Sequence, residues 1–426
     1  MAVGLEQFAR ACRMTECHDE ALLEAVGVSF MDTIAVANAG TNEAVVRALA
    51  DAHPHASVGL ESQALLGATA AHALDYDDVQ LSSVTHASAV IVPALIAAAF
   101  AVPGPAIASG YLAGLTAASQ LAAALGPSHY SSGWHATSTI GPFAAAAAVA
   151  RMWGLSQTHT ENALSLALCQ AAGLQRSFGS MAKPLQAGLA SSNGLRAAVW
   201  ASRGITGSST PFGPNGFDVL YSGHPAFEPD WSRHVGVDVS RKPYPCCYAS
   251  QRLVSAALEI RRLLSGRNYH GLVMKVRAGT LRPLTISVPK DGNEAKFCAS
   301  YLVAVAITDG NVELRHFHAG SLERPDLANA ARKIRIIEHG PPANSIEDGT
   351  VEAVCTSETG QIIAQTSVAA FPGSPAAPLN REQMEAKFLD CYVGCKQAVA
   401  AMKQRVEEAI RANIVTRPLL SFGDFK

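Results

Sequence analysis

Charged residues are scarce in this chain. Asp, Glu, Lys and Arg together make up 16% of the 426 positions, the net charge at pH 7 is only −2, and neither a basic tract nor an acidic tail is present. A protein without a concentrated positive field is not expected to bind nucleic acid, or to bind a membrane surface through a polybasic patch. We therefore expect neither class of partner.

Long uninterrupted apolar runs and a regularly spaced cysteine framework are also missing. The first 13 residues carry three charged side chains and no continuous apolar core, so we expect no signal peptide. Apolar runs such as 87–102 contain a proline and are shorter than the roughly 20 residues that a membrane span needs. The nine cysteines are scattered and form no CxxC motif, which fits free thiols in a reducing compartment. We expect a soluble, cytoplasmic protein.

Hydrophobic residues take the place of charge and occupy 49% of the positions. A chain of this length and composition can bury a large core and is expected to divide into two domains. Alanine-rich helices with few Lys or Glu residues usually pack on several sides. A homo-oligomer with a broad interface is therefore expected.

Acids and imidazoles gather in one stretch of this charge-poor chain. His72, Asp75, Asp77 and Asp78 lie within seven residues, beside small apolar side chains, and His86 follows before an apolar helix. On a helix His72 and Asp75 would share a face, and the other two aspartates would lie where that helix ends. A carboxylate that loses hydration must be paired, hydrogen-bonded or used in function.

Three interpretations of these aspartates stay open at this point. They could cap helix ends, they could serve catalysis, or they could bind a metal with the histidines. Two of the acids are adjacent, and the chain contains neither an HExxH motif nor a Cys/His pattern. We therefore expect no metal site.

A polar and aromatic segment, 126–138, lies between two alanine-rich helices. It contains His129, Tyr130, Trp134 and His135 within seven residues. Loops of this kind often carry function, and an ordinary connector is the alternative. We interpret the segment as the wall of a pocket.

A second loop is predicted at 177–188, where Lys183 is the only charged residue among small and apolar ones. A lysine in such a place is either a solvated surface charge or a preformed anchor for a carboxylate. Both interpretations stay open from the residues alone.

The pattern changes after about residue 235. Alternating segments predict strands, and helical segments lie among them; the strands are at 272–278, 333–338, 351–356 and 361–368, and the helices at about 250–264, 294–308 and 325–332. Helical periodicity returns from residue 380, and we expect this tail to pack back on the first domain. The predicted fold is mainly α with an α+β second domain: residues 1–235 and 380–426 form an all-helical domain, and residues 236–379 form the α+β domain.

Five segments together resemble the MmgE/PrpD family, which includes 2-methylcitrate dehydratase, cis-aconitate decarboxylase and iminodisuccinate epimerase. The resemblance covers nearly the whole chain. The segments are His72-Ala-Leu-Asp75-Tyr-Asp-Asp78 with His86, Gly133-Trp-His135-Ala-Thr137, Lys183-Pro184-Leu185 with Gly188, Lys242-Pro-Tyr-Pro245, and Glu294-Ala-Lys-Phe297 with Tyr301.

The resemblance implies an all-helical domain with an inserted α+β domain, a homodimer, and neither a metal nor an organic cofactor. It also implies a catalytic cleft between the domains, formed by Asp75, His86, His135, Lys183 and Tyr301. The shared chemistry makes or breaks a bond next to a carboxylate-stabilised carbanion of a small di- or tricarboxylate.

The residue types support that chemistry. A proton next to a carboxylate is weakly acidic, so a base is needed together with groups that hold the developing negative charge. We expect His86, polarised by Asp75, to transfer protons and Lys183 to neutralise a substrate carboxylate. His135 or Tyr301 would then supply a second proton or a hydrogen bond.

Three positions depart from the pattern that is common in the family. Val79-Gln80 stands where Thr-His is common after the Asp-Asp pair, and Gln251 stands where many members have a histidine. A neutral amide cannot act as a general acid in the way imidazole can. We expect Gln251 to contact the substrate. The same role is expected for three residues of the polar segment: His129, Tyr130 and Thr137.

The leading prediction is a cofactor-independent lyase that dehydrates a citrate-like hydroxy acid, such as 2-methylcitrate or an alkylcitrate. Epimerisation of an iminodisuccinate-like dicarboxylate is the closest alternative, because the context of Trp134-His135 and His129-Tyr130 resembles that of the epimerase. Decarboxylation of the cis-aconitate type is third. A catalytically inactive member that binds a carboxylate is the alternative from another functional class.

Overall fold

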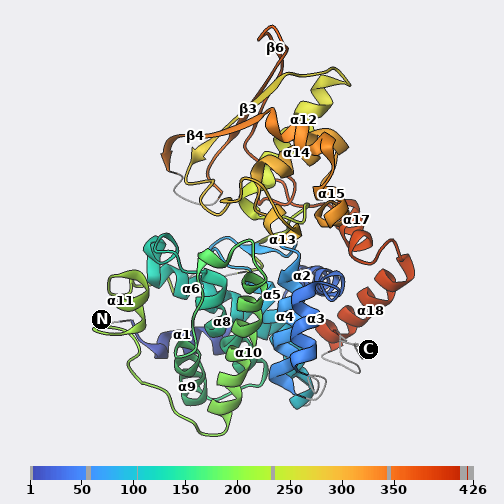
Figure 1. The fold of residues 1–426 in the computed structure, drawn as a ribbon. Helices are drawn as coiled ribbons and strands as arrows, with labels where there is room; N and C mark the ends of the chain where they lie inside the picture. Colours follow the sequence, from blue (N-terminus) through green and yellow to red (C-terminus); the bar gives the residue numbers. More distant parts are fainter. Residues whose placement is uncertain are drawn as a thin grey trace.

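The computed structural model describes residues 3–53, 59–102, 104–231, 236–342, 347–412 and 420. The described chain forms a broad helical body with a smaller α+β domain above it (Figure 1). The helices of the body are α1 (Leu5–Met14), α2 (Glu20–Gly40), α3 (Ala44–Ala52), α4 (Leu60–Ala73), α5 (Ala87–Ala98), α6 (Ile107–Ser131), α7 (Ala136–Thr139), α8 (Gly141–Met152), α9 (Gln157–Leu168), α10 (Ala182–Ser202) and α11 (Phe217–Ser222).

The α+β domain contains a four-stranded sheet of order β4-β3-β5-β6. Strands β3 (Gly271–Ala278) and β4 (Ile334–Pro342) pair parallel, whereas β5 (Val351–Thr356) pairs antiparallel with both β3 and β6 (Ile362–Val368). Its helices are α12 (Gln251–Leu264), α13 (Gly292–Ala295), α14 (Ala299–Asp309), α15 (Ala319–Leu322) and α16 (Pro325–Arg332). A two-residue ladder of β1 (Val79–Gln80) and β2 (Val239–Ser240) connects the body to the start of this domain.

Two C-terminal helices return along the side of the body (Figure 1). Helices α17 (Arg381–Cys391) and α18 (Lys396–Ala412) both pack on α2, and their apolar side chains belong to the core of the body. A separate core fills the space between the sheet and α12 and α14. The predicted fold class is confirmed, while the exact boundaries at residues 235 and 380 stay predictions.

Small residues allow the central helices to approach closely. Helices α4, α5, α8 and α10 pack against one another, and α8 is almost entirely buried. A Cβ atom at Gly188 of α10 would lie 2.1 Å from Thr69 Oγ1 and 2.6 Å from the Leu65 carbonyl oxygen on α4. Any larger side chain there would push α10 away from α4. This close contact brings the start of α10, with Lys183, beside the end of α4.

Two predicted loops are largely helical. Helix α6 continues to Ser131 across a non-helical residue, Gly126, and α7 begins at Ala136. Helix α10 begins at Ala182, so Lys183 lies in its first turn rather than in a loop.

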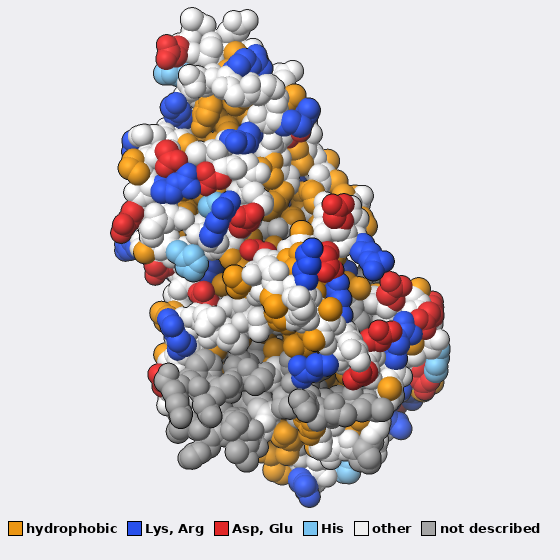
Figure 2. Space-filling view, turned by 90° about the vertical axis from the view of Figure 1, so that its right-hand side faces the viewer, with side chains coloured by type: hydrophobic (Ala, Val, Ile, Leu, Met, Phe, Trp, Pro, Cys, Tyr) orange, Lys and Arg blue, Asp and Glu red, His pale blue; other side chains and the backbone are white. Residues whose placement is uncertain are grey.

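The side view in Figure 2 shows Lys and Arg side chains interspersed with Asp and Glu side chains over the coloured part of that face. No helix in the described part of the chain combines the length and the apolar character that a bilayer crossing requires.

Candidate active site

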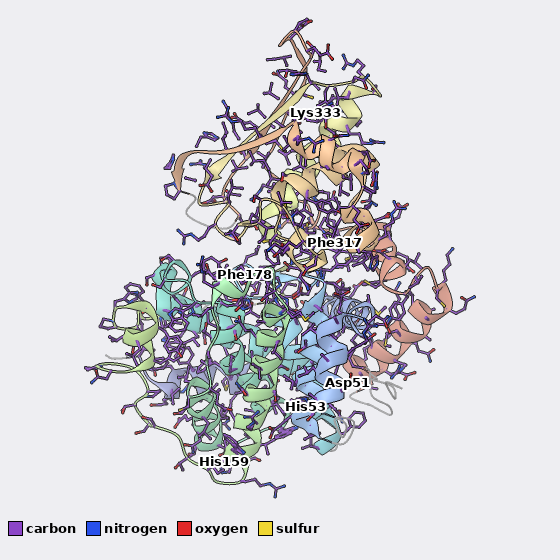
Figure 3. All side chains as sticks on the ribbon, viewed as in Figure 1. Asp51, His53, His159, Phe178, Phe317 and Lys333 are labelled. Atoms are coloured by element: carbon purple, nitrogen blue, oxygen red, sulfur yellow. The ribbon has the colours of Figure 1, made fainter. Side chains whose placement is uncertain are left out.

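A cavity of about 60 Å³ lies at the junction of the helical body and the α+β domain. Phe178, which is one of its walls, is labelled at this junction in Figure 3. The body contributes Asp75, His86, Tyr130, His135, Thr137 and Lys183, and the α+β side contributes Cys247, Tyr248, Pro283 and Phe297. The polar groups converge on one small space whose other walls are apolar, as is usual in sites for small molecules.

Asp75 owes its position to a turn directly after α4. The helix ends at Ala73, and Asp75 adopts a left-handed backbone conformation with φ of 50°. A non-glycine residue in this region is strained unless the surrounding structure holds it. Asp75 and His72 therefore do not share a helical face, contrary to the prediction from the sequence.

Three buried lysines hold this turn through its backbone carbonyl groups. Lys296 donates to the carbonyl of residue 73 at 2.9 Å, Lys242 to that of residue 75 at 2.8 Å, and Lys387 to that of residue 76 at 2.8 Å. Each of the three is 3% exposed or less. Charge-assisted hydrogen bonds to these carbonyls compensate the strain and fix the direction of the Asp75 side chain.

Lys242, together with a fourth lysine, Lys183, also holds the carboxylate of Asp75. Its Oδ1 atom accepts from Lys242 Nζ at 2.5 Å and from Lys183 Nζ at 3.3 Å. Burial alone would raise the pKa of Asp75, but the ammonium groups of Lys183 and Lys242 outweigh burial and lower it. Asp75 is therefore a permanent anion at neutral pH.

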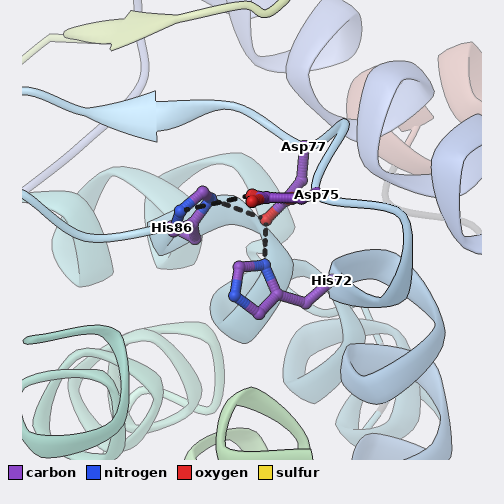
Figure 4. A group of neighbouring side chains, drawn as sticks. All are labelled: His72, Asp75, Asp77 and His86. Atoms are coloured by element: carbon purple, nitrogen blue, oxygen red, sulfur yellow. Dashed lines mark hydrogen bonds and ion pairs between the residues drawn. The ribbon is translucent and has the colours of Figure 1, made fainter. Parts of the chain in front are cut away.

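Asp77 serves two histidines with one oxygen atom. Its Oδ2 accepts from His72 Nδ1 at 2.8 Å and lies 3.0 Å from His86 Nδ1 (Figure 4). Burial would raise the pKa of Asp77, but His72 and His86 lower it well below its usual range. The predicted partner of His86, Asp75, has its Oδ1 3.9 Å from His86 Nε2, so Asp77 is a second and nearer carboxylate that the prediction did not include.

The protonation of the cluster follows from these contacts. A carboxylate can only accept, so His72 carries its proton on Nδ1, and its Nε2 accepts from Lys183 Nζ at 2.7 Å. Burial lowers the pKa of His86 to about 3 although Asp77 opposes the shift. His86 is thus neutral at rest, with Nδ1 toward Asp77 and Nε2 on the side of Asp75.

Lys183 is 4% exposed, so the interpretation as a solvated surface charge is wrong. Its Nζ lies 5.6 Å from the ring centre of Phe178 and 5.4 Å from that of Phe297. Burial lowers the pKa of Lys183, and Asp75 opposes that shift. The Lys183 ammonium has three N–H groups and contacts His72 Nε2, one carboxylate oxygen and two aromatic faces, so this cation can still take up a further anion.

The cluster resembles a metal site in its donor types. The ligand atoms of His72, Asp75, Asp77 and His86 lie within 4.8 Å of one another. However, His72 Nε2 and Asp75 Oδ1 already contact the Lys183 ammonium, and Lys242 contacts Asp75 as well. Two ammonium groups at the same donors would repel a divalent cation. This donor set fits paired lysines better than a metal, and the metal-free reaction stays a prediction.

The predicted residues of the polar segment fall into two groups. Tyr130, His135 and Thr137 line the cavity, and Thr137 Oγ1 also accepts from the His86 backbone N–H at 3.0 Å. His129 does not line it. Both of its ring nitrogens are engaged elsewhere, Nε2 with Thr139 Oγ1 at 2.8 Å and Nδ1 with a backbone carbonyl oxygen at 3.1 Å. His129 therefore contacts Thr139 and Tyr221 and not the space of the cavity.

Two other predicted residues lie outside the cavity lining. Tyr301 donates its hydroxyl hydrogen to the His316 carbonyl at 2.5 Å, within the core of the α+β domain. Gln251 donates to the carbonyls of Tyr244 and Cys246, both at 3.1 Å, and so shapes the turn before Cys247. The structure brings Asp75, His86, His135 and Lys183 together, whereas Tyr301 and Gln251 lie apart from them. The catalytic and binding roles of all six residues stay predictions.

Several residues of the site were absent from the predicted set. His72, Asp77 and Lys242 stand within segments that the sequence singled out, so their spacing offered a signal. Phe178 and Phe297 also lie within such segments, the loop at 177–188 and the segment Glu294-Ala-Lys-Phe297. Nothing in the sequence indicated that these rings would form cavity walls, because an aromatic residue in a sequence looks like an ordinary core residue.

Comparison with known proteins agrees with the architecture. The family model described as the MmgE/PrpD N-terminal domain matches residues 4–230, and the MmgE/PrpD C-terminal domain matches residues 244–414. The chain is similar to cis-aconitate decarboxylase of Mus musculus, with 25% identity over 84% of this chain and 78% of the relative. It is also similar to cis-aconitate decarboxylase of Homo sapiens, with 25% identity over 76% of this chain and 71% of the relative. The enzyme of Aspergillus terreus is 24% identical over 65% of this chain and 63% of the relative. The resemblance seen in the sequence is thereby confirmed: this chain belongs to the MmgE/PrpD family.

Proposed function

We propose that this protein is a cofactor-independent lyase that acts on a small di- or tricarboxylate. The reaction passes through a carbanion that a neighbouring carboxylate group of the substrate stabilises. The observation that carries the proposal is the ion pair of Lys183 and Asp75 beside His86 in one cavity, with Asp77 in contact with His86 from outside the lining. It combines a buried cation for a substrate carboxylate with an imidazole that can move a proton. The similarity to cis-aconitate decarboxylases supports a lyase of this family.

In this reaction Lys183 binds one substrate carboxylate and stabilises the enediolate that develops from it. A preorganised charge in a water-poor site is effective because it needs no reorganisation when the negative charge appears. Phe178 and Phe297 limit the access of water to this ammonium group. Asp75, held by Lys242, keeps Lys183 protonated between turnovers.

His86 is the group proposed to move the proton. Its Nδ1 faces Asp77, and its Nε2, which lies 3.9 Å from Asp75 Oδ1, carries the lone pair that can take a proton from the substrate and return it later. The imidazolium formed in this step would be stabilised by the Asp77 carboxylate. Because burial lowers the pKa of His86, the proton is returned readily.

Dehydration of a citrate-like hydroxy acid is the first candidate for the net reaction. A leaving hydroxyl group needs a proton donor, and Tyr130 lines the cavity with a phenol whose pKa is raised by burial. Such a phenol stays protonated and can donate. Decarboxylation of a cis-aconitate-like acid is the second candidate, and the named activity of the relatives favours it.

The test is incubation in deuterated water with 2-methylcitrate, cis-aconitate and iminodisuccinate, followed by NMR. Formation of an unsaturated acid from the hydroxy acid supports dehydration, loss of carbon dioxide from cis-aconitate supports decarboxylation, and exchange alone indicates an epimerase. Lys183→Met serves as the control, because it keeps much of the side-chain volume and removes the charge. No turnover of any acid together with tight binding would indicate an inactive carboxylate-binding protein instead.

We also propose that the chain forms a homodimer, as the family resemblance implies and as the alanine-rich helices suggest for a homo-oligomer, and that it is cytoplasmic, as the expected lack of a signal peptide and the scattered cysteines indicate. Light scattering on the purified protein would measure the mass in solution, and a mass of one chain at micromolar concentration would contradict the dimer.

A further inference from the structure

His135 lines the cavity with one ring nitrogen engaged and the other without a partner. Its Nδ1 lies 2.6 Å from Gln186 Oε1, and its Nε2 is buried with no hydrogen-bond partner among the described residues. The residue is 3% exposed, and its backbone N–H donates to the Gly173 carbonyl at 3.1 Å. A buried polar atom without a partner has a cost unless a ligand satisfies it.

The orientation of the Gln186 amide follows from its other contacts. Its Nε2 donates to Ser177 Oγ at 2.8 Å and reaches the Leu174 carbonyl at 3.5 Å. A backbone carbonyl can only accept, so the NH₂ group faces Leu174 and the oxygen faces His135. The amide oxygen accepts, which assigns the proton of the neutral imidazole to Nδ1 and leaves a lone pair on Nε2.

His135 also stays uncharged. Burial, the Lys183 ammonium and His72 hold the pKa of His135 well below its usual range, and the neutral amide of Gln186 opposes them only weakly. His135 differs in this respect from His86, which has a carboxylate as its partner. In the resting enzyme, the Nε2 atom of His135 can accept a hydrogen bond and cannot donate one.

A pure acceptor at the cavity distinguishes between substrate classes. A fully ionised acid without a hydroxyl or N–H group would place carboxylate oxygens or C–H groups against this lone pair. A hydroxy acid can direct its O–H at Nε2 and satisfy the buried acceptor.

We propose that Gln186 is a positioning residue that holds His135 as a hydrogen-bond acceptor, and that this acceptor selects substrates bearing a hydroxyl group. The inference rests on the proposed function, since it assumes that a small carboxylate occupies this cavity. It deepens that function by naming the two residues that favour a hydroxy acid over the other candidate substrates.

The experiment compares two acids that have the same skeleton and three carboxylates, citrate and propane-1,2,3-tricarboxylate. Calorimetric titration of the wild-type protein should show citrate binding more tightly by a factor on the order of 10, the value of one hydrogen bond to a buried acceptor. Equal affinities would overturn the inference while leaving the carboxylate site intact. Binding of neither acid would overturn the proposed function together with the inference.

Two variants separate the positioning role from a general effect on folding. Gln186→Glu is nearly isosteric, and its carboxylate should favour the imidazolium form of His135, which donates from Nε2. The preference for citrate should then fall to about 1-fold or reverse, whereas a merely structural role would weaken both acids equally. His135→Phe should remove the preference while Lys183 still binds both acids. An unchanged ratio in either variant would refute the assignment.

Discussion

Substitution of Asp77 by asparagine should impair proton transfer by His86 without impairing the binding of substrate. Asp77 is buried, its Oδ2 accepts from His72 Nδ1 at 2.8 Å, and His86 Nδ1 lies 3.0 Å from the same oxygen. Asparagine keeps the shape but removes the charge that would stabilise the His86 imidazolium. Its NH₂ group can also donate to Nδ1, which would move the imidazole proton to Nε2 and block proton uptake.

General acid or base groups contribute about 10²- to 10⁴-fold to rates. At about 1.4 kcal/mol for each factor of ten, Asp77→Asn should raise the barrier by roughly 3 to 6 kcal/mol. Lys183 still holds the substrate carboxylate in this variant, so KM should change much less than kcat. Steady-state kinetics on the substrate found in the NMR assay would give both values.

The neighbouring residue supplies a matched control. Asp78 is equally buried, but its Oδ2 accepts from Ser88 Oγ at 2.6 Å, whereas that of Asp77 faces His72 and His86. Asp78→Asn should therefore retain most of the activity. Equal losses in the two variants would mean that any change in this stretch disturbs the fold, and a full rate in Asp77→Asn would show that His86 does not depend on this carboxylate.

Four further predictions concern other parts of the structure. Lys183→Ala should weaken substrate binding in calorimetric titrations, whereas His86→Ala should keep affinity near normal and lower the rate by about 10² or more; the opposite result would exchange their roles. Activity should survive exhaustive chelation, and a loss that one divalent ion restores would revive the metal interpretation. Tyr301→Phe should cost about 1 kcal/mol of stability in urea denaturation and leave kcat unchanged, since its hydroxyl only bonds the His316 carbonyl; a large loss of kcat would restore its catalytic role. Burial, with help from Asp32, raises the pKa of Asp78 from 3.8 to about 7, so this group should destabilise the fold progressively as pH rises from about 4 through 7, by on the order of 4 kcal/mol. The urea midpoint of Asp78→Asn minus that of the wild type should accordingly increase between pH 5 and pH 8. A difference that does not change with pH would contradict the raised pKa of Asp78.

Periodicity predicted the secondary structure of the second domain closely. The strand expected at 351–356 is β5, and the helix expected at 325–332 is α16. Alternation in strands and helical spacing are local properties of the chain, so the residues themselves carry them. The end of α4 was placed too late because the left-handed turn at Asp75 has no local signal such as glycine.

The residue types of the active site were easier to predict than the contacts between its carboxylates and imidazoles. Acids, imidazoles and Lys183 stood out because charged groups are rare in the chain. Which carboxylate meets which imidazole could not be predicted, since it depends on where the chain turns after α4. The same limit hid the tautomer of His135, because Gln186 lies 51 positions away in the chain and acts only through the packing of α7 against α10.

The lysines around Asp75 link the integrity of the whole fold to catalysis. Lys242 and Lys296 come from the α+β side and Lys387 comes from α17, yet all three donate to the carbonyls of residues 73–76. An ammonium group loses several kcal/mol of hydration on burial, so each must be compensated by a precise acceptor. Only the docked arrangement of both domains and the C-terminal helices provides those acceptors. The strained conformation of Asp75 is therefore stable only where the cavity is complete, and Lys183 meets its carboxylate only in a fully assembled protein.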